Sequence, residues 1–358
     1  MSYGGLVDEV LIHLTLVIDY ITYAYNTLVS FILIKFLNQT PLHVHTTSQS
    51  YHPAVLVTGT SSGIGRDVAL TLAKQGYTVF ATVRREDDAE ELKNTFAEFD
   101  NVMNGSLLPL IMDVTNKDDI QKAYNSVRST IGREIPFVGL VNNAAFILYV
   151  PLEIASESCN EDSFNTNYFS IVNLTKKFLP LLRESRGRVV NIGSIASWGP
   201  APSMGIYSAT KAALRAITQV WRMETRSMGM HFSLIEPGVV ATRFTENQLK
   251  AYRNFVSFTS NSKYHDITYN ITSNAIESYE NLFRMIAKRS SLFTASTPPA
   301  VVSDAIVHAL TAPYPKNTYY VGLDARLIAV ASWFFGDRIF EAVQAKALAV
   351  PNDMINVM

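Results

Sequence analysis

A serine, a tyrosine and a lysine near the middle of the chain have a spacing that suits proton transfer. Ser194 precedes Tyr207 by thirteen residues, and Lys211 follows the tyrosine by four. Four residues are about one helical turn, so Tyr207 and Lys211 are expected to project from the same helix face. Because an ammonium group beside a phenol favours the phenolate, the spacing predicts a lowered pKa for Tyr207 and a proton-transfer role near neutral pH.

A glycine-rich stretch far upstream supplies the second half of this pattern. It reads TGTSSGIG from Thr58 to Gly65, between a predicted strand at Ala54–Val57 and a helical stretch at Asp67–Gln75 that stops at Gly76. Glycines permit a tight turn and let the backbone approach a pyrophosphate, and the following helix aims its amino terminus at the same charge. Together the two patterns predict a dinucleotide-dependent enzyme that moves a hydride and a proton.

The residues after the next predicted strand, Thr78–Val83, indicate which dinucleotide. An acidic residue there would hold a ribose 2′-hydroxyl, but this chain has Arg84 and Arg85. An arginine about twenty residues past such a turn can pair with a 2′-phosphate, and Ser62 could add a hydroxyl. NADP is therefore favoured over NAD. The alternative is that both arginines are solvated surface charges.

Apolar runs alternate with helical stretches over most of the chain. Continuous apolar strands separated by helices indicate a parallel sheet covered on both faces. The predicted fold class is α/β, a Rossmann-like doubly wound sheet in one catalytic domain, with ligands at the carboxyl ends of the strands. The remaining predicted strands are Leu107–Met112, Val138–Val141, Arg188–Ile192, Phe232–Ile235 and Tyr319–Val321.

Composition excludes several other classes of protein. The 358 residues are 48% hydrophobic and 17% charged, so a substantial core can be buried. The net charge of -1 gives no reason to expect a nucleic-acid partner. The single cysteine, Cys159, excludes an intramolecular disulfide, and no Cys/His cluster has the spacing of a metal site.

These motifs resemble the short-chain dehydrogenase/reductase family over roughly residues 54 to 310. The family's turn maps to Thr58–Gly65 and its Asp-Val pair, whose aspartate contacts the adenine amino group, to Asp113 and Val114. The family's Asn-Asn-Ala-Gly motif is present as Asn142–Ala145, with Ala145 replacing the glycine. The resemblance implies that NADP is held by residues Gly59, Ser61, Ser62, Gly63, Ile64, Gly65, Arg84, Asp113, Val114, Asn143, Tyr207, Lys211, Pro237, Gly238, Val240 and Thr242.

The resemblance also implies four catalytic residues, Asn167, Ser194, Tyr207 and Lys211. In the reducing direction Tyr207 would donate a proton to the carbonyl oxygen and Ser194 would hydrogen-bond that oxygen. Lys211 would lower the tyrosine's pKa and hold the nicotinamide ribose, while Asn167 would position a water. Some stretches resemble the retinol dehydrogenase and 17-beta-hydroxysteroid dehydrogenase branch, several members of which are anchored to endoplasmic reticulum membranes.

The first residues differ in composition from the rest of the chain. Residues 10–37 are mostly apolar, and Tyr20–Leu37 has the ~18 residues of a marginal membrane span. Residues 1–38 are predicted to associate with a membrane, either spanning it or lying at its surface, and packing on the catalytic domain is the alternative. Asp8 and Glu9 near the start of this segment and Lys35 near its end favour a cytosolic catalytic domain, and the resemblance indicates the endoplasmic reticulum.

The remaining predictions concern the domain boundaries and the substrate. Residues 39–53 are predicted to be a linker, 54–325 the catalytic domain with an aromatic-rich lid at about 243–292, and 326–358 an apolar helical extension. An aromatic lid suits a lipophilic alcohol, ketone or aldehyde of retinoid or steroid type, although aromatic packing of helices is the alternative. Two other functions stay open, a reductase of acyl or sphingoid keto-lipids and a non-catalytic NADPH-binding scaffold. The resemblance also implies a homo-oligomer.

Overall fold

The computed structural model describes residues 52–98, 105–242 and 297–334. It also describes residues 41–45, 47, 279 and 339–342, and positions 17, 20, 21, 24 and 28. The elements below belong to the larger of two compact units, residues 45–311 and 315–358. The strands are β1 (Ala54–Val57), β2 (Thr78–Val83), β3 (Ser106–Ile111), β4 (Phe137–Asn142), β5 (Arg188–Ile192), β6 (His231–Pro237) and β7 (Thr318–Val321).

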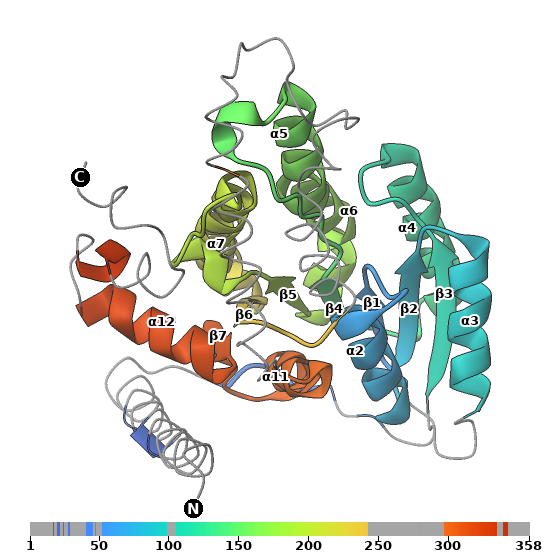
Figure 1. Ribbon diagram of the computed structural model, residues 1–358. Coiled ribbons are helices and arrows are strands. Elements are labelled where there is room, and N and C mark those ends of the chain that lie inside the picture. The colour runs from blue at the N-terminus through green and yellow to red at the C-terminus, as the bar shows by residue number, and fades with distance from the viewer. Residues whose placement is uncertain are drawn as a thin grey trace, which may run out of the picture. The chain divides into compact units, whose positions relative to one another are not determined.

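These strands form one parallel seven-stranded sheet in the order β3-β2-β1-β4-β5-β6-β7 (Figure 1). The order reverses between β1 and β4, which places a ligand site at the carboxyl ends of these two strands. Every residue of β1, β2, β4 and β5 is buried, as expected for strands covered on both faces. The predicted α/β doubly wound fold is confirmed.

Helices cover the sheet on both faces. One core cluster joins the sheet to α2, α3 and α11, and the second joins it to α4 and α6, with Trp221 of α7 packed against it. Apolar residues three and four apart, such as Val68 and Leu72 of α2, build these buried stripes. The longer helices are α2 (Gly63–Lys74), α3 (Glu86–Ala97), α4 (Lys117–Ile131), α5 (Glu157–Phe164), α6 (Ser170–Ser185), α7 (Gly205–Thr225), α11 (Pro299–Thr311) and α12 (Leu323–Phe334).

Four short helical segments complete the described elements. Three are 3₁₀ turns, and the fourth, η3, is a π-helical segment that joins α5 to α6. A π-helical turn is rare and is frequently found at functional sites. The bounds are η2 (Leu152–Ile154), η3 (Asn165–Phe169), η4 (Ile195–Ser197) and η5 (Arg226–Met228).

Several predicted segments fall outside this description. The lid at about 243–292 and the membrane-associating segment at 1–38 lie outside the described residues, apart from isolated positions. Within the part of the chain that is described, no helix is both long and apolar enough to cross a membrane. The predicted boundary between residues 325 and 326 falls inside α12.

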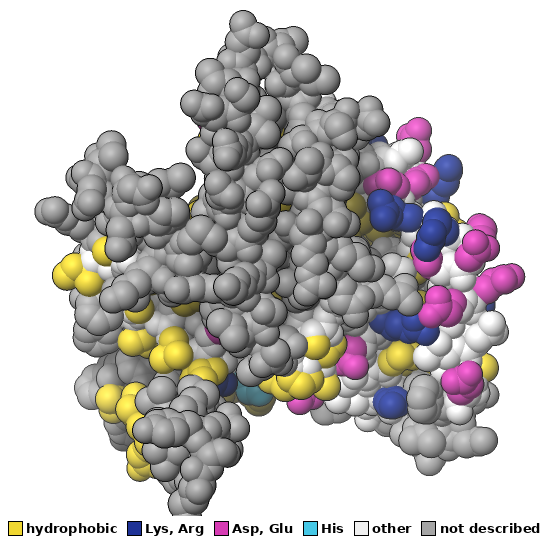
Figure 2. All heavy atoms as spheres, viewed as in Figure 1, with side chains coloured by type: hydrophobic (Ala, Val, Ile, Leu, Met, Phe, Trp, Pro, Cys, Tyr) yellow, Lys and Arg dark blue, Asp and Glu magenta, His cyan; other side chains and the backbone are white. Residues whose placement is uncertain are grey.

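Charged side chains cover the α3 and α4 side in Figure 2, whereas hydrophobic ones gather over α11 and α12, where Val301, Leu327 and Val330 are exposed.

Candidate active site

The glycine-rich turn between β1 and α2 leaves no room for side chains at its glycines. Gly59 and Gly63 have φ angles of 68° and 61°, which L side chains rarely adopt. A Cβ at Gly65 would lie 2.3 Å from the Gly59 carbonyl oxygen and 2.4 Å from Asn143 Nδ2. The first turn of α2 therefore sits directly on the loop, with its backbone close enough to contact a bound phosphate.

Asn143, which follows β4, braces this turn. Its Nδ2 donates to the carbonyl oxygens of Thr58 at 2.8 Å and Gly59 at 3.0 Å. In return, the Thr58 hydroxyl accepts from the backbone N–H groups of Asn143 and Ala144. Asn143 was predicted to contact the cofactor, and the structure places its amide nitrogen on the loop that would hold it.

The amino terminus of α2 borders an open pocket of about 360 Å³. Ser62 precedes the helix in an extended conformation and makes no side-chain capping bond. The uncapped N–H groups of a first turn suit an anion such as a pyrophosphate. The pocket lies beside Gly63 rather than at Ser194 and Tyr207. Its walls are Ser62, Gly63, Arg66, Asp67, Leu70, Ala241, Thr242 and Pro299.

The two arginines after β2 differ in their surroundings. Arg85 forms two hydrogen bonds with the Asp88 carboxylate, at 2.9 and 2.8 Å, from the residue that precedes α3. Arg84 is exposed. Since a carboxylate already engages Arg85, Arg84 is the better placed of the two for a 2′-phosphate.

The Asp-Val pair follows β3 as predicted. Asp113 Oδ1 accepts from the backbone N–H and the hydroxyl of Thr115, at 2.8 and 2.7 Å, which fixes its side chain in a local turn. Val114 is buried in the second core cluster. Asp113 thus stays at the carboxyl edge of the sheet, two strands away from the order reversal.

Ser194, Tyr207 and Lys211 come together where β5 ends against α7. The Tyr207 side chain hydrogen-bonds Ser194, and Lys211 Nζ lies 5.5 Å from the centroid of the Tyr207 ring. Lys211 Nζ donates to the carbonyl oxygen of Ile192 at 2.8 Å. Tyr207 is 7% exposed and Lys211 2%. The spacing along α7 does place both side chains on one face, as predicted.

The predicted direction of the Tyr207 pKa shift is wrong. Burial raises the pKa of Tyr207 to about 12, while its hydrogen bond with Ser194 acts in the lowering direction. Burial also lowers the pKa of Lys211 to about 8, because a charged ammonium is costly to desolvate. The predicted shift considered only the electrostatic attraction between a Tyr207 phenolate and the Lys211 ammonium. Burial removes water from both side chains, and this loss of solvation dominates both pKa values. A phenol in this state keeps its proton at neutral pH and is a weaker acid than a solvent-exposed tyrosine.

Asn167 lies in the π-helical segment η3 and is fully buried. Its Oδ1 accepts from the Phe146 N–H at 2.8 Å, and its Nδ2 donates to the Phe146 carbonyl at 2.7 Å and to Thr210 Oγ1 at 3.1 Å. Thr210 Oγ1 in turn donates to the Tyr207 carbonyl at 2.7 Å. Asn167 therefore ties the loop after β4 to the turn of α7 that carries Tyr207. The water contact predicted for Asn167 stays a prediction.

The segment after β6 closes the site on its other side. Gly238 N–H donates to Val321 at 2.9 Å, and Val239 N–H to Asp324 Oδ2 at 2.7 Å. A Cβ at Gly238 would lie 2.0 Å from Asp324 Oδ1, so this glycine is needed for the close approach. Val240 pairs with Thr297 in an isolated parallel bridge, and Pro237 ends β6.

Thr242 approaches the glycine-rich turn from this segment. Its Cγ2 lies 3.1 Å from the position of a Cβ on Gly63. The Thr242 hydroxyl donates to the Val240 carbonyl at 3.5 Å. The segment after β6 therefore meets the loop after β1 at the amino end of α2.

Two acidic residues that were not predicted as site residues organise the carboxyl edge of the sheet. Asp324, at the start of α12, fixes Gly238 and Val239 as described above. Glu236, in β6, is fully buried and accepts hydrogen bonds from Ser197, Trp198 and Arg215. The only sequence signal was a carboxylate inside an apolar strand directly before Pro237.

Ala145 stands where the resemblance expects glycine. The residue is exposed, and its φ does not lie in the left-handed region. The backbone conformation at this position therefore makes no demand for glycine.

Comparison with known proteins gives one family. The model of the short chain dehydrogenase family matches residues 53–253. The 17-beta-hydroxysteroid dehydrogenase type 6 of Rattus norvegicus is 31% identical over 281 residues, which are 77% of this chain and 82% of that protein. The 3-ketodihydrosphingosine reductase of Bacteroides thetaiotaomicron is 33% identical over 195 residues, or 54% of this chain and 66% of that protein.

One solved structure is similar to this chain in both sequence and fold. The closed form of serine dehydrogenase complexed with NADP+ is 28% identical and has a TM-score of 0.56, covering 74% of this chain and 93% of that one.

Proposed function

The chain belongs to the short-chain dehydrogenase family and is an oxidoreductase acting on CH–OH groups, and on this premise we propose that it interconverts a lipophilic alcohol and its ketone or aldehyde with NADP(H). The observation that carries the proposal is the buried hydrogen bond between Tyr207 and Ser194 beside Lys211. A binding scaffold has no need of a buried proton donor held against a hydroxyl, which favours the enzyme over the scaffold.

Each residue has a role that its surroundings support. Tyr207 keeps its proton at neutral pH and donates it to the carbonyl oxygen during reduction. Ser194, which hydrogen-bonds Tyr207, also hydrogen-bonds that oxygen as charge develops on it. Lys211 supplies a positive charge beneath the tyrosine, and Asn167 holds the helix turn that carries it. The residues at the carboxyl edge of β1 and β4 would hold a nicotinamide cofactor, which would supply the hydride.

The cradle around the turn fits such a cofactor. Gly59, Gly63 and Gly65 keep the backbone bare, and the uncapped first turn of α2 faces the same place. The preference for NADP over NAD rests on Arg84, and the NADP+ complex of the related serine dehydrogenase supports it.

Replacing Arg84 with alanine tests this preference. We expect the KM for NADPH to rise on the order of 10-fold to 100-fold, with little change for NADH, because one charge-assisted phosphate contact is lost. Arg85→Ala is the matched control, since Asp88 already holds Arg85, and it should leave both values within about twofold. Steady-state kinetics with both cofactors measure this. Equal effects of the two substitutions on NADPH would contradict the assignment.

The substrate class is proposed from the relatives and the sequence. A hydroxysteroid dehydrogenase and a 3-ketodihydrosphingosine reductase both act on lipophilic molecules by their names. A retinoid- or steroid-like substrate is the first candidate, and a sphingoid or acyl ketone is the second. NADPH oxidation by the full chain against retinal, keto-steroids and long-chain ketones separates them. No turnover on any lipophilic carbonyl would contradict the proposal.

Membrane attachment at the endoplasmic reticulum, with the catalytic domain cytosolic, is a further proposal. Its support is the apolar composition of residues 10–37 and the resemblance to a membrane-anchored branch. We expect the full chain to stay in the membrane fraction after a high-salt wash, and a chain starting at Thr46 to be released. Release of the full chain by salt alone would contradict insertion into the bilayer.

Self-association is also proposed. Phe169, Val220 and Met223 are large apolar side chains exposed on η3 and α7, at 50%, 44% and 62%. Apolar side chains on neighbouring helices suit a contact between two copies. Light scattering of the detergent-solubilised chain should give a dimer or tetramer, and a monomer at micromolar concentration would contradict this.

A further inference from the structure

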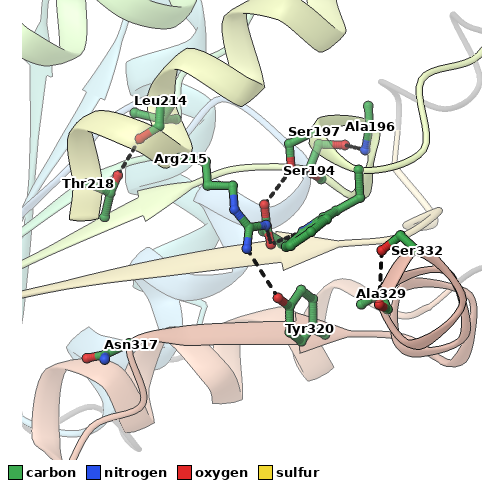
Figure 3. Close-up of polar contacts among 12 residues, drawn as sticks. Ser194, Ala196, Ser197, Leu214, Arg215, Thr218, Asn317, Tyr320, Ala329 and Ser332 are labelled. Atoms are coloured by element: carbon green, nitrogen blue, oxygen red, sulfur yellow. Dashed lines mark hydrogen bonds and ion pairs between the residues drawn. The ribbon is translucent and has the colours of Figure 1, made fainter. Parts of the chain in front are cut away.

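A buried carboxylate in β6 joins three elements of the site. Glu236 has no exposed surface, and three side chains donate to it. Ser197 Oγ donates to Oε1 at 2.5 Å, and Trp198 Nε1 and Arg215 Nη1 donate to Oε2 at 2.9 and 2.8 Å. Figure 3 shows Arg215 reaching from α7 toward the η4 turn that carries Ser197 and toward Tyr320.

The donors are held as firmly as the carboxylate. The Arg215 guanidinium stacks on the Trp198 ring, with its Cζ 3.5 Å from the ring centroid. Arg215 Nη2 also donates to the Tyr320 hydroxyl at 3.4 Å. A buried ion pair is stable only when its charges and remaining donors are satisfied, and this one meets that condition. The cluster formed by Ser197, Trp198, Arg215 and Glu236 is therefore a rigid unit.

This cluster is directly connected to Ser194. The Ser197 hydroxyl oxygen lies 2.5 Å from Glu236 Oε1 and 2.8 Å from the Ser194 carbonyl oxygen, so its single proton bridges these two acceptors. Gly193, just before Ser194, donates its N–H to the Ile235 carbonyl at 2.7 Å, just before Glu236. A Cβ at Gly193 would lie 3.2 Å from Glu236 Cγ. Two contacts on either side of Ser194 thus fix its backbone against the end of β6.

The same cluster is connected to the helix of Tyr207 and Lys211. Arg215 lies four residues after Lys211 and eight after Tyr207, so the three side chains share one face of α7. Through Arg215, Glu236 anchors that face to the strand whose next residues are Pro237 and Gly238. One carboxylate therefore contacts both the turn that follows Ser194 and the helix that carries Tyr207.

We propose that Glu236 is a positioning residue that holds Ser194 against Tyr207 through Ser197, Trp198 and Arg215. The inference rests on the proposed function, because it concerns the geometry of that reaction. A role confined to the stability of the fold predicts lower stability with no specific dependence on Ser194.

The test uses the full chain and a double-mutant cycle with Ser194. In Glu236→Gln, the single-turnover rate of NADPH oxidation should fall on the order of 10-fold, because small misplacements of reacting groups are costly. The Kd for NADPH should change by less than about twofold, so the loss appears in the chemical step. In the Ser194→Ala background the same substitution should change the rate by less than about twofold.

Two further variants make the test decisive. Ser197→Ala removes one donor and leaves the ion pair intact, so it should fold and show the same dependence on Ser194 at smaller amplitude. Ser233→Ala is the matched control, because Ser233 is also buried in β6 and donates to the Lys316 carbonyl at 2.9 Å, away from Ser194. It should lower the melting temperature and leave the rate unchanged.

The outcomes separate this inference from the proposed function. If wild type turns over and the rate loss in Glu236→Gln and Ser197→Ala is equally large without Ser194, the positioning role is overturned. The same holds if both variants behave like Ser233→Ala. If wild type binds NADPH and reduces no lipophilic carbonyl, the proposed function fails and the positioning role fails with it.

Discussion

Replacing Tyr207 with phenylalanine should lower turnover by at least about 1000-fold, because the substitution removes the proton donor and leaves the ring in place. The Tyr207 phenol hydrogen-bonds Ser194, and its pKa of about 12 keeps it protonated at neutral pH. NADPH affinity should stay within about threefold, since the hydroxyl contributes little to holding the rest of the cofactor. Steady-state kinetics and a fluorescence titration of NADPH measure the two quantities.

Tyr319→Phe is the matched control for this loss. Tyr319 is also 7% exposed, and burial also raises its pKa to about 12. Its hydroxyl bonds His308 Nδ1 and the Lys316 N–H, in β7 and away from Ser194. This variant should lose stability, about 1 kcal/mol for the broken hydrogen bonds, and keep its turnover. A Tyr207→Phe enzyme with more than a tenth of wild-type turnover would contradict the acid role.

Replacing Gly65 with alanine should abolish cofactor binding. The new Cβ would lie 2.3 Å from the Gly59 carbonyl oxygen and 2.4 Å from Asn143 Nδ2, so the turn must open. Opening moves the backbone that faces the phosphates and breaks the Asn143 brace. We expect the Kd for NADPH to rise by at least about 100-fold, which corresponds to about 2.7 kcal/mol. Isothermal titration calorimetry measures it.

Gly132→Ala separates this effect from glycine loss in general. Gly132 ends α4 with a φ of 57°, and a Cβ there would meet no atom within 4 Å. The substitution should cost about 1 kcal/mol of stability through backbone strain. It should leave the Kd for NADPH unchanged. A Gly65→Ala protein that binds NADPH as tightly as wild type would contradict the cradle.

The fold could be predicted from the sequence because the strands are short, mostly apolar runs, and most of them adjoin polar residues, proline or glycine. β1, β2 and β5 have the predicted bounds, and β3, β4, β6 and β7 differ by one or two residues at their ends. Parallel strands also place their carboxyl ends at one edge, so residues from Gly59 to Thr242 could be assigned to one site. The α2 helix begins at Gly63, four residues before the predicted start at Asp67, because the end of the glycine-rich turn forms its first turn.

The parts that could not be predicted depend on pairs of distant residues. Glu236 meets Arg215 and Trp198, which are 21 and 38 residues away, and no periodicity links them. The Tyr207 pKa depends on how completely the packed chain excludes water, which spacing does not encode. Likewise, the hydrogen bonds of Asn167 to the Phe146 carbonyl and of Asn143 to the Thr58 carbonyl join residues 21 and 85 positions apart.

The most direct measurement follows the hydride itself. The full chain is incubated with NADPH carrying deuterium at one C4 position and with the best lipophilic carbonyl of the panel, and the product is analysed by mass spectrometry. With one of the two C4-labelled forms, the product alcohol should gain one mass unit, on the former carbonyl carbon. Product without deuterium from either form, or no product with NADPH bound, would contradict hydride transfer as the activity of this protein.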